Sequence, residues 1–201
     1  MTFKQKTLVA AILTVAAAVA QQPSLPLKTL YNFTGTGGDG RTPLAGLAIG
    51  SGSAGQPVFY GTTFNGGDLD VGTVFSLTPP GTPGGAWTEA VLPSFNGRNG
   101  GNPAAGVVIG NDGVLYGTTS HGGVVYSLTP PTIAGGAWTE RVLHRFINNG
   151  QDGYDPDGAL AIGSGGILYG TTPYGGASSA CGTTGCGTVF SLTPPATSDG
   201  A

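Results

Sequence analysis

Three copies of one sequence pattern run through this chain. Each copy starts with Tyr-Gly-Thr-Thr, continues through a Gly-Gly pair and ends with Ser-Leu-Thr-Pro-Pro. The copies start at Tyr60, Tyr116 and Tyr169 and end at Pro80, Pro131 and Pro195, which gives a period of 51 to 64 residues. Recurrence at such a period is typical of tandem repeats in which one supersecondary unit is used several times.

Each unit is expected to contain short antiparallel strands. Apolar and β-branched residues alternate within each run, glycine-rich turns separate the runs, and the Pro-Pro pair ends the third strand because proline cannot donate to a ladder. The predicted strands are 44–49, 58–63, 73–78 and 87–95, then 104–109, 114–119, 124–129 and 138–146, and finally 159–162, 167–172 and 188–193.

The pattern predicts an all-β fold of tandem four-stranded antiparallel repeats that resemble β-propeller blades. The units are 27–95, 96–146 and 147–195, within one repeat domain that covers 21–201. A β-sandwich and a β-solenoid are the alternatives, and the solenoid is less favoured because its coils are usually shorter.

Three blades are fewer than the usual four to eight. Residues 27–33 align with the ends of the fourth strands, 92–95 and 143–146, and an N-terminal strand often completes the last blade of a closed propeller. The chain could therefore be a fragment of a longer protein, an assembly of several copies or an open arc, and we expect the fragment.

The first twenty residues have the layout of a secretory signal peptide. Lys4 and Lys6 precede an apolar run over 8–20, and Ala18-Val19-Ala20 offers a cleavage site. A membrane helix is less favoured because the run is short. We expect a secreted or cell-surface protein with no membrane span after cleavage.

Charge argues against two classes of partner. Only 8% of the residues are charged, and 21–201 holds five basic and ten acidic residues, a net charge of −5. No basic cluster is present, so nucleic acid and anionic membranes are not expected partners.

The two cysteines, Cys181 and Cys186, lie in the insertion of the third unit. In an exported protein they are expected to form a disulfide that stiffens this loop. Their spacing does not fit a redox Cys-x-x-Cys motif or a zinc site.

The repeated segments resemble those of a known family. The segments 115–119, 122–123 and 72–78 read Leu-Tyr-Gly-Thr-Thr, Gly-Gly and Gly-Thr-Val-Phe-Ser-Leu-Thr. They are similar to the GloVer-type (Gloeo_Verruco) extracellular tandem repeat of exported bacterial proteins. The resemblance covers nearly all of 21–201 and implies export, often with a separate C-terminal anchor. This chain has no such anchor segment, which again suggests truncation.

Candidate binding residues lie on loops expected at one end of the blades. These are the loops between units, 39–43, 99–103 and 152–156, and the loops between second and third strands. Variable loops on a rigid scaffold are common binding sites. The candidate ligand-binding residues are Asp68, Asp70, His121, Asp155, Asp157 and Tyr174.

A tight turn and a calcium loop are the other interpretations of these residues. Asp-Gly and Asn-Gly pairs suit tight turns, which is sufficient cause for their recurrence. Asp152, Asp155 and Asp157 partly resemble a calcium loop, but Gly153 stands where a first ligand would be needed and no Glu follows at the right distance, so the full calcium-loop pattern is absent. We expect no metal and no cofactor.

The sequence favours an exported, non-catalytic binding or interaction module for an extracellular ligand such as a carbohydrate or a protein. No catalytic residue is assigned. One alternative is a secreted propeller enzyme acting on polysaccharide, a glycoside hydrolase or lyase, with carboxylates such as Asp68, Asp70, Asp155 and Asp157. Another is a structural surface or matrix component. Unpaired blade edges also suggest self-association.

Overall fold

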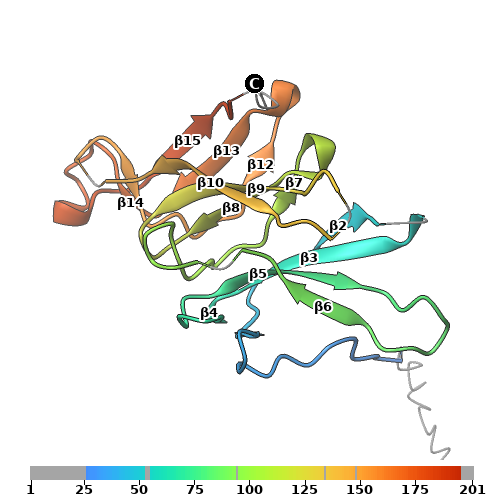
Figure 1. Ribbon diagram of the computed structural model, residues 1–201. Helices are drawn as coiled ribbons and strands as arrows, with labels where there is room; N and C mark the ends of the chain where they lie inside the picture. Colours follow the sequence, from blue (N-terminus) through green and yellow to red (C-terminus); the bar gives the residue numbers. More distant parts are fainter. Residues whose placement is uncertain (1–25, 53–54, 94, 134, 148, 196–201) are drawn as a thin grey trace, which may run out of the picture.

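The computed structural model describes residues 26–52, 55–93, 95–133, 135–147 and 149–195. In this part of the chain the protein is all-β, as predicted, and each repeat unit forms one antiparallel sheet. Figure 1 shows the three sheets stacked in chain order, with the first at the bottom and the third at the top. We call them sheet 1, sheet 2 and sheet 3.

Each sheet is a meander whose strands follow chain order. Sheet 1 contains β2 (Ala48–Ser51), β3 (Pro57–Thr63), β5 (Thr73–Thr78) and β6 (Thr88–Val91). Sheet 2 contains β7 (Val108–Ile109), β8 (Leu115–Thr119), β9 (Val124–Thr129) and β10 (Thr139–Arg145). Sheet 3, within the described residues, contains β12 (Ala161–Ile162), β13 (Leu168–Thr172) and β15 (Thr188–Leu192).

The described residues also include two small ladders and the short 3-10 turns η2 (Asn111–Gly113), η3 (Ser164–Gly166) and η4 (Gly182–Thr184). The ladders pair β1 (Gly40–Arg41) with β4 (Asn65–Gly66), and β11 (Gly153–Tyr154) with β14 (Tyr174–Gly175).

The opening strands are shorter than predicted. Residues 44–47 and 104–107 were expected to pair in a ladder, but β2 begins at Ala48 and β7 at Val108. We call the segment before each opening strand, such as 44–47 or 104–107, a lead-in. In the second lead-in, Ala105 and Val107 are buried, and Val107 lies in the core between sheets 1 and 2. Their alternation therefore reflects contact with the preceding sheet and not strand pairing.

The glycine of each Tyr-Gly-Thr-Thr motif makes room for an aromatic ring. The cross-strand pairs are Gly61 with Phe75, Gly117 with Tyr126 and Gly170 with Phe190. A Cβ atom built on Gly117 would meet the ring of Tyr126. The ring thus occupies the space of a missing side chain, which explains why glycine recurs in the middle of a strand.

The first threonine of the motif joins consecutive sheets. Thr62 Oγ1 donates to the carbonyl of Ala105 at 3.0 Å, and Thr118 Oγ1 donates to the carbonyl of Gly158 at 3.1 Å. Both acceptors lie two residues after the proline that opens the next unit. Both threonines are buried, whereas Thr171, at the same position in sheet 3, is exposed.

The second threonine closes the loop that follows its own strand. Its hydroxyl donates to the carbonyl two residues on, in the pairs Thr63 to Asn65, Thr119 to His121 and Thr172 to Tyr174. In sheets 1 and 3 it also meets the hydroxyl that opens the third strand, Thr73 or Thr188, at 2.8 and 2.9 Å. The Thr-Thr pair is therefore explained by structure, with no need for a nucleophile.

Thr118→Val is expected to lower the free energy of unfolding by about 1–2 kcal/mol, because the half-buried carbonyl of Gly158 loses the donor that the buried Thr118 supplies. Urea denaturation followed by tryptophan fluorescence measures this. Thr171→Val is the matched control and should change the stability of the monomeric protein by less than about 0.5 kcal/mol, since that side chain is exposed. Equal losses in the two variants would contradict the assigned contact.

The core lies between the sheets and not within any one of them. Sheets 1 and 2 enclose Val74, Leu92, Phe95, Val107, Leu115, Val124, Tyr126 and Leu128. Sheets 2 and 3 enclose Val125, Phe146, Leu160 and Leu168. Each repeat therefore depends on its neighbour for burial, as in other repeat architectures.

One aromatic contact recurs at each sheet. Phe95 packs edge-on against Tyr126 and Phe146 against Phe190, each with ring centroids 5.1 Å apart. Phe33 meets Phe75 in the same way at 5.0 Å. Residues 27–33, although described, form no strand, but they take the position on sheet 1 that the end of a preceding unit takes on sheets 2 and 3.

Candidate functional site

The loops between units and the loops after the second strands meet at one end of the sheets. β1 pairs with β4 and β11 with β14, and in the second unit a single bridge joins Gly101 to His121. Figure 1 shows β4 and β14 on the same side of the stack. We call this side the loop end.

The turn that enters each unit has a residue with a left-handed backbone just before its proline. These residues are Thr42, Asn102 and Asp155, with φ of 62°, 51° and 62°. Asn and Asp tolerate this conformation well. The backbone therefore accounts for the presence of Asp155 in its turn without any ligand.

Thr42 is the least suitable of the three residues, because β-branched side chains are strained at positive φ. Thr42→Asn, which copies the second unit, is expected to raise the free energy of unfolding by about 1 kcal/mol. Thermal unfolding followed by circular dichroism measures the change. Asn102→Thr should lower stability by a similar amount, and changes of the same sign in the two variants would contradict the turn argument.

The residue that opens each entry turn caps nearby backbone. Asp39 accepts from the N–H and hydroxyl of Thr34, and Asp152 accepts from the N–H groups of Ile147 and Gly153. Asp152 also lies 3.2 Å from His144 Nε2. Among the residues that the structure describes, no three His, Cys, Asp or Glu side chains are grouped so that they could hold a metal ion.

Three of the six candidate residues line one hollow at the loop end. His121, Asp155 and Asp157 surround it together with Phe64, Asn102 and Tyr154. We call it the acidic hollow. It lies between the entry turn of the third unit and the loop after β8, so it combines residues from consecutive units.

Both carboxyl groups of the acidic hollow hold their protons more tightly than usual. Burial raises the pKa of Asp155, and the nearby His121 opposes that rise. Burial also raises the pKa of Asp157, and the charge of Asp155 adds to the effect. Adjacent acids with raised pKa values are common at functional sites but also occur in structural clusters.

The other three candidates lie elsewhere. Asp70 forms a two-point ion pair with Arg41, whose Nε and Nη2 lie 3.0 and 2.6 Å from its carboxylate oxygens, and this pairing lowers its pKa. Asp68 lines a separate hollow in the first unit. Tyr174 is exposed on β14, directly across the ladder from Tyr154.

The hollow of the first unit contains a carboxylate that was not among the candidates. Burial, with a further contribution from the charge of Asp39, raises the pKa of Glu89 to about 7. Burial would also raise the pKa of Asp39, but hydrogen bonds from Thr34, Gly40 and Tyr31 outweigh it and lower that pKa. In the second unit Asn99 replaces Asp39, and its amide donates to Glu140 at 2.5 Å.

Glu89→Gln is expected to stabilise the protein at pH 8 but not at pH 4. The raised pKa means that folding disfavours the charged form, so wild-type stability falls as pH rises from about 4.5 to about 7. Because Glu89 is partly exposed, we expect a gain of about 1 kcal/mol after solvent screening.

Urea denaturation of the variant and the wild type at both pH values measures the difference. Glu140→Gln is the control with a smaller expected gain, because Asn99 already donates to that carboxylate. A gain from Glu89→Gln that does not depend on pH would contradict the raised pKa.

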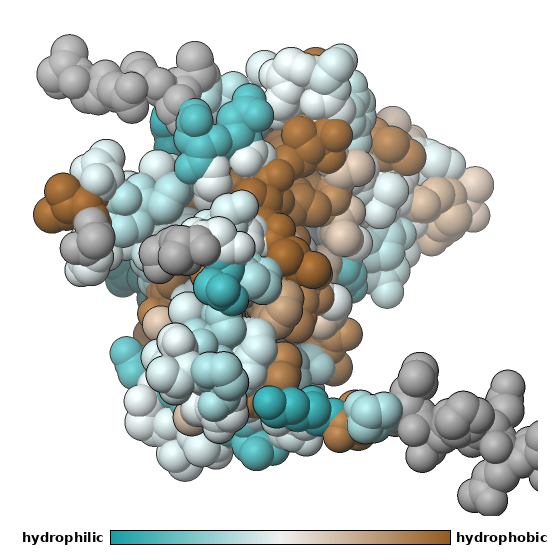
Figure 2. Space-filling model, turned by 90° about the vertical axis from the view of Figure 1, so that its right-hand side faces the viewer, coloured by the Kyte–Doolittle hydropathy of each residue, from teal (hydrophilic) through white to brown (hydrophobic). Residues whose placement is uncertain are grey.

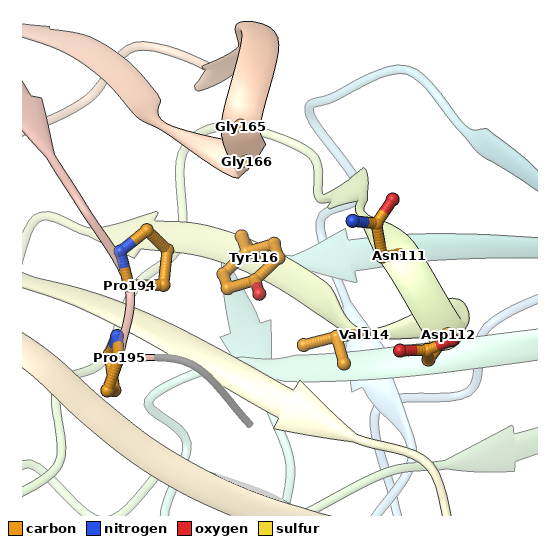
Figure 3. Close-up of a pocket in the computed structure, with 8 residues that line it drawn as sticks. All are labelled: Asn111, Asp112, Val114, Tyr116, Gly165, Gly166, Pro194 and Pro195. Atoms are coloured by element: carbon orange, nitrogen blue, oxygen red, sulfur yellow. The ribbon is translucent and has the colours of Figure 1, made fainter. Parts of the chain in front are cut away.

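A pocket lies at the opposite end of the sheets (Figure 3). Tyr116 stands at its floor between Pro194 on one side and the turn of Asn111 and Asp112 on the other. The equivalent position between sheets 1 and 2 holds Trp138, which packs edge-on against Tyr60 with centroids 5.8 Å apart. The pocket therefore repeats a hollow that lies between sheets 1 and 2 beside Trp138, and we assign it no ligand.

The predicted disulfide between Cys181 and Cys186 is present in the structure. It spans η4 and closes the long loop of the third unit at the loop end. Among the described residues, no helix is long and apolar enough to cross a membrane. The predicted signal peptide, 1–20, lies outside the described residues.

Comparison with known proteins identified the family of the chain. No curated protein and no solved structure matched the chain. The family described as the Gloeobacter/Verrucomicrobia repeat matches residues 58–199, which include all three copies of the Tyr-Gly-Thr-Thr motif and most of the chain. The chain therefore belongs to the Gloeobacter/Verrucomicrobia repeat family.

Proposed function

We propose that the protein is exported and acts outside the cell or at its surface as a non-catalytic binding module, with its sheets packed as in a β-propeller. Three observations support this proposal. The apolar segment 8–20 has the layout of a leader, the disulfide suits an oxidising compartment, and consecutive sheets bury apolar residues between them.

The acidic hollow is the proposed binding site, and the observation that carries it is its mixed lining. Tyr154 is 44% exposed and lies beside Asp155 and Asp157. An exposed aromatic ring offers an apolar surface, and carboxylates accept hydrogen bonds from hydroxyl groups. This combination suits a neutral carbohydrate, which is the ligand class we propose.

A glycan array probed with the exported protein, followed by calorimetry on any ligand found, tests the proposal. Tyr154→Ala and Asp157→Asn should each weaken binding at least tenfold, a loss of about 1.4 kcal/mol. Asn111→Ala, at the opposite end of the sheets, is the control and should bind as the wild type does. Absence of any glycan ligand would favour a purely structural role.

A polysaccharide-degrading enzyme is the second candidate, and the raised pKa values of Asp155 and Asp157 favour it. The other two acids of that hypothesis, Asp68 and Asp70, do not line the same hollow. Release of reducing ends from polysaccharides by the wild type, lost in Asp157→Asn while binding persists, would support the enzyme over the binding module.

A further inference from the structure

The two outer faces of the stack carry the same kinds of residue as the inner faces. On the outer faces, however, these residues are exposed. On the outward face of sheet 3, Val189 is 82% exposed and Tyr169 is 42% exposed. The valines at the same position in sheets 1 and 2, Val74 and Val125, are fully buried against the next sheet.

The opposite end of the stack shows the complementary pattern. On the lead-in and opening strand of sheet 1, Leu47 is 50% exposed and Ile49 is 68% exposed. The residues that correspond to Leu47, Val107 and Leu160, are each 5% exposed because the preceding sheet covers them. Figure 2 views the stack from one side, between these two outward faces, and shows a band of hydrophobic surface there.

The contact between sheets is built the same way both times. One sheet contributes the valine of its third strand and the tyrosine and first threonine of its motif. The next sheet contributes its lead-in residue and the carbonyl two positions after its opening proline. On sheet 3, the valine, tyrosine and threonine of this contact are Val189, Tyr169 and Thr171. On sheet 1, the lead-in residue and the carbonyl are those of Leu47 and Ala45.

We propose that the outward face of sheet 3 docks on the outward face of sheet 1 of a second copy of this chain. In this contact Val189 packs on Leu47 and Ile49 of the other copy, and Thr171 Oγ1 donates to its Ala45 carbonyl. The occupant is a second copy because the two faces keep the valine, tyrosine, threonine, lead-in and carbonyl positions of a contact that the chain already makes internally twice. On sheet 1, Phe33 already takes the place that Phe95 and Phe146 take on sheets 2 and 3.

This docking is heterologous, since two different faces meet. It uses blade faces and not the strand edges that sequence alone suggested. Two copies joined at both contacts would contain six sheets, within the four to eight blades that propellers use. The proposal goes beyond carbohydrate binding and does not depend on it, because the acidic hollow is not needed for the contact.

Analytical ultracentrifugation of the exported protein tests the proposal with two variants. Val189→Asp disables the face of sheet 3 and Ile49→Asp the face of sheet 1, so each variant alone should be monomeric. Mixed in equal amounts they should form a one-to-one complex, because each supplies the intact face that the other lacks. Ile133→Asp, an exposed position in the loop between β9 and β10 of the middle sheet, is the control and should associate like the wild type.

Thr171→Val adds a milder test that introduces no charge. It should weaken association about tenfold, the effect of one buried hydrogen bond. Near-ultraviolet circular dichroism confirms that every variant is folded. A wild type that stays monomeric at all concentrations, or an equimolar mixture that forms no complex, would overturn the proposal. Loss of glycan binding would leave it standing, since the two readouts are separate.

Discussion

Val125→Asp is expected to prevent folding, whereas Val189→Asp should fold normally. The two valines occupy the same position of the repeat, on the third strand of sheets 2 and 3. Val125 is fully buried in the core between those sheets, and Val189 is 82% exposed. A carboxylate at Val125 would be buried away from water, which costs about 4 kcal/mol or more.

That loss approaches the whole stability of a typical domain, which is about 5–15 kcal/mol. Circular dichroism and tryptophan fluorescence should show an unfolded or poorly recovered Val125→Asp protein. Val189→Asp should melt within a few degrees of the wild type when both are monomeric, since association would itself add stability. A folded Val125→Asp protein would mean that the sheets do not pack as described.

The sequence predicted the strands well where a local rule governs them. The third strands, 73–78 and 124–129, were placed without error because Pro-Pro ends them and β-branched residues fill them. The prediction of a paired strand over the lead-in 104–107 was wrong. Alternating apolar residues show that one side of a segment is buried, but they do not show whether a paired strand or a neighbouring sheet buries it. The small ladders of β1 and β11 were missed, since two-residue pairs leave no periodicity to detect.

The candidate site was harder to predict because its members come from different units. Loop position alone grouped His121 with Asp70, yet Asp70 pairs with Arg41 and lies apart from the acidic hollow. No local spacing encodes which loops of consecutive units meet. The effect of Asp39 on the pKa of Glu89 cannot be read directly from the sequence. The sequence shows only that Asp39 stands where the second unit has Asn99, which donates to Glu140.

Gly117→Ala is expected to lower the free energy of unfolding by about 3 kcal/mol. Strand propensity predicts the opposite, because alanine is favoured over glycine in a strand by about 0.5–1 kcal/mol. Steric overlap determines the sign of the stability change, because the new Cβ would lie 2.6 Å from Cζ of Tyr126, closer than two non-bonded carbon atoms approach. Gly81→Ala, where nothing lies within 4 Å of the new Cβ, is the control and should be nearly neutral.

A double variant separates this overlap from a backbone effect. Tyr126→Leu removes the ring, so alanine at position 117 should cost much less in that background than in the wild type. The two changes should then couple by more than about 1 kcal/mol in a double-mutant cycle measured by urea denaturation. Additive losses would show instead that Gly117 is required for its backbone, and the recurring glycine of the motif would need another explanation than the aromatic ring opposite it.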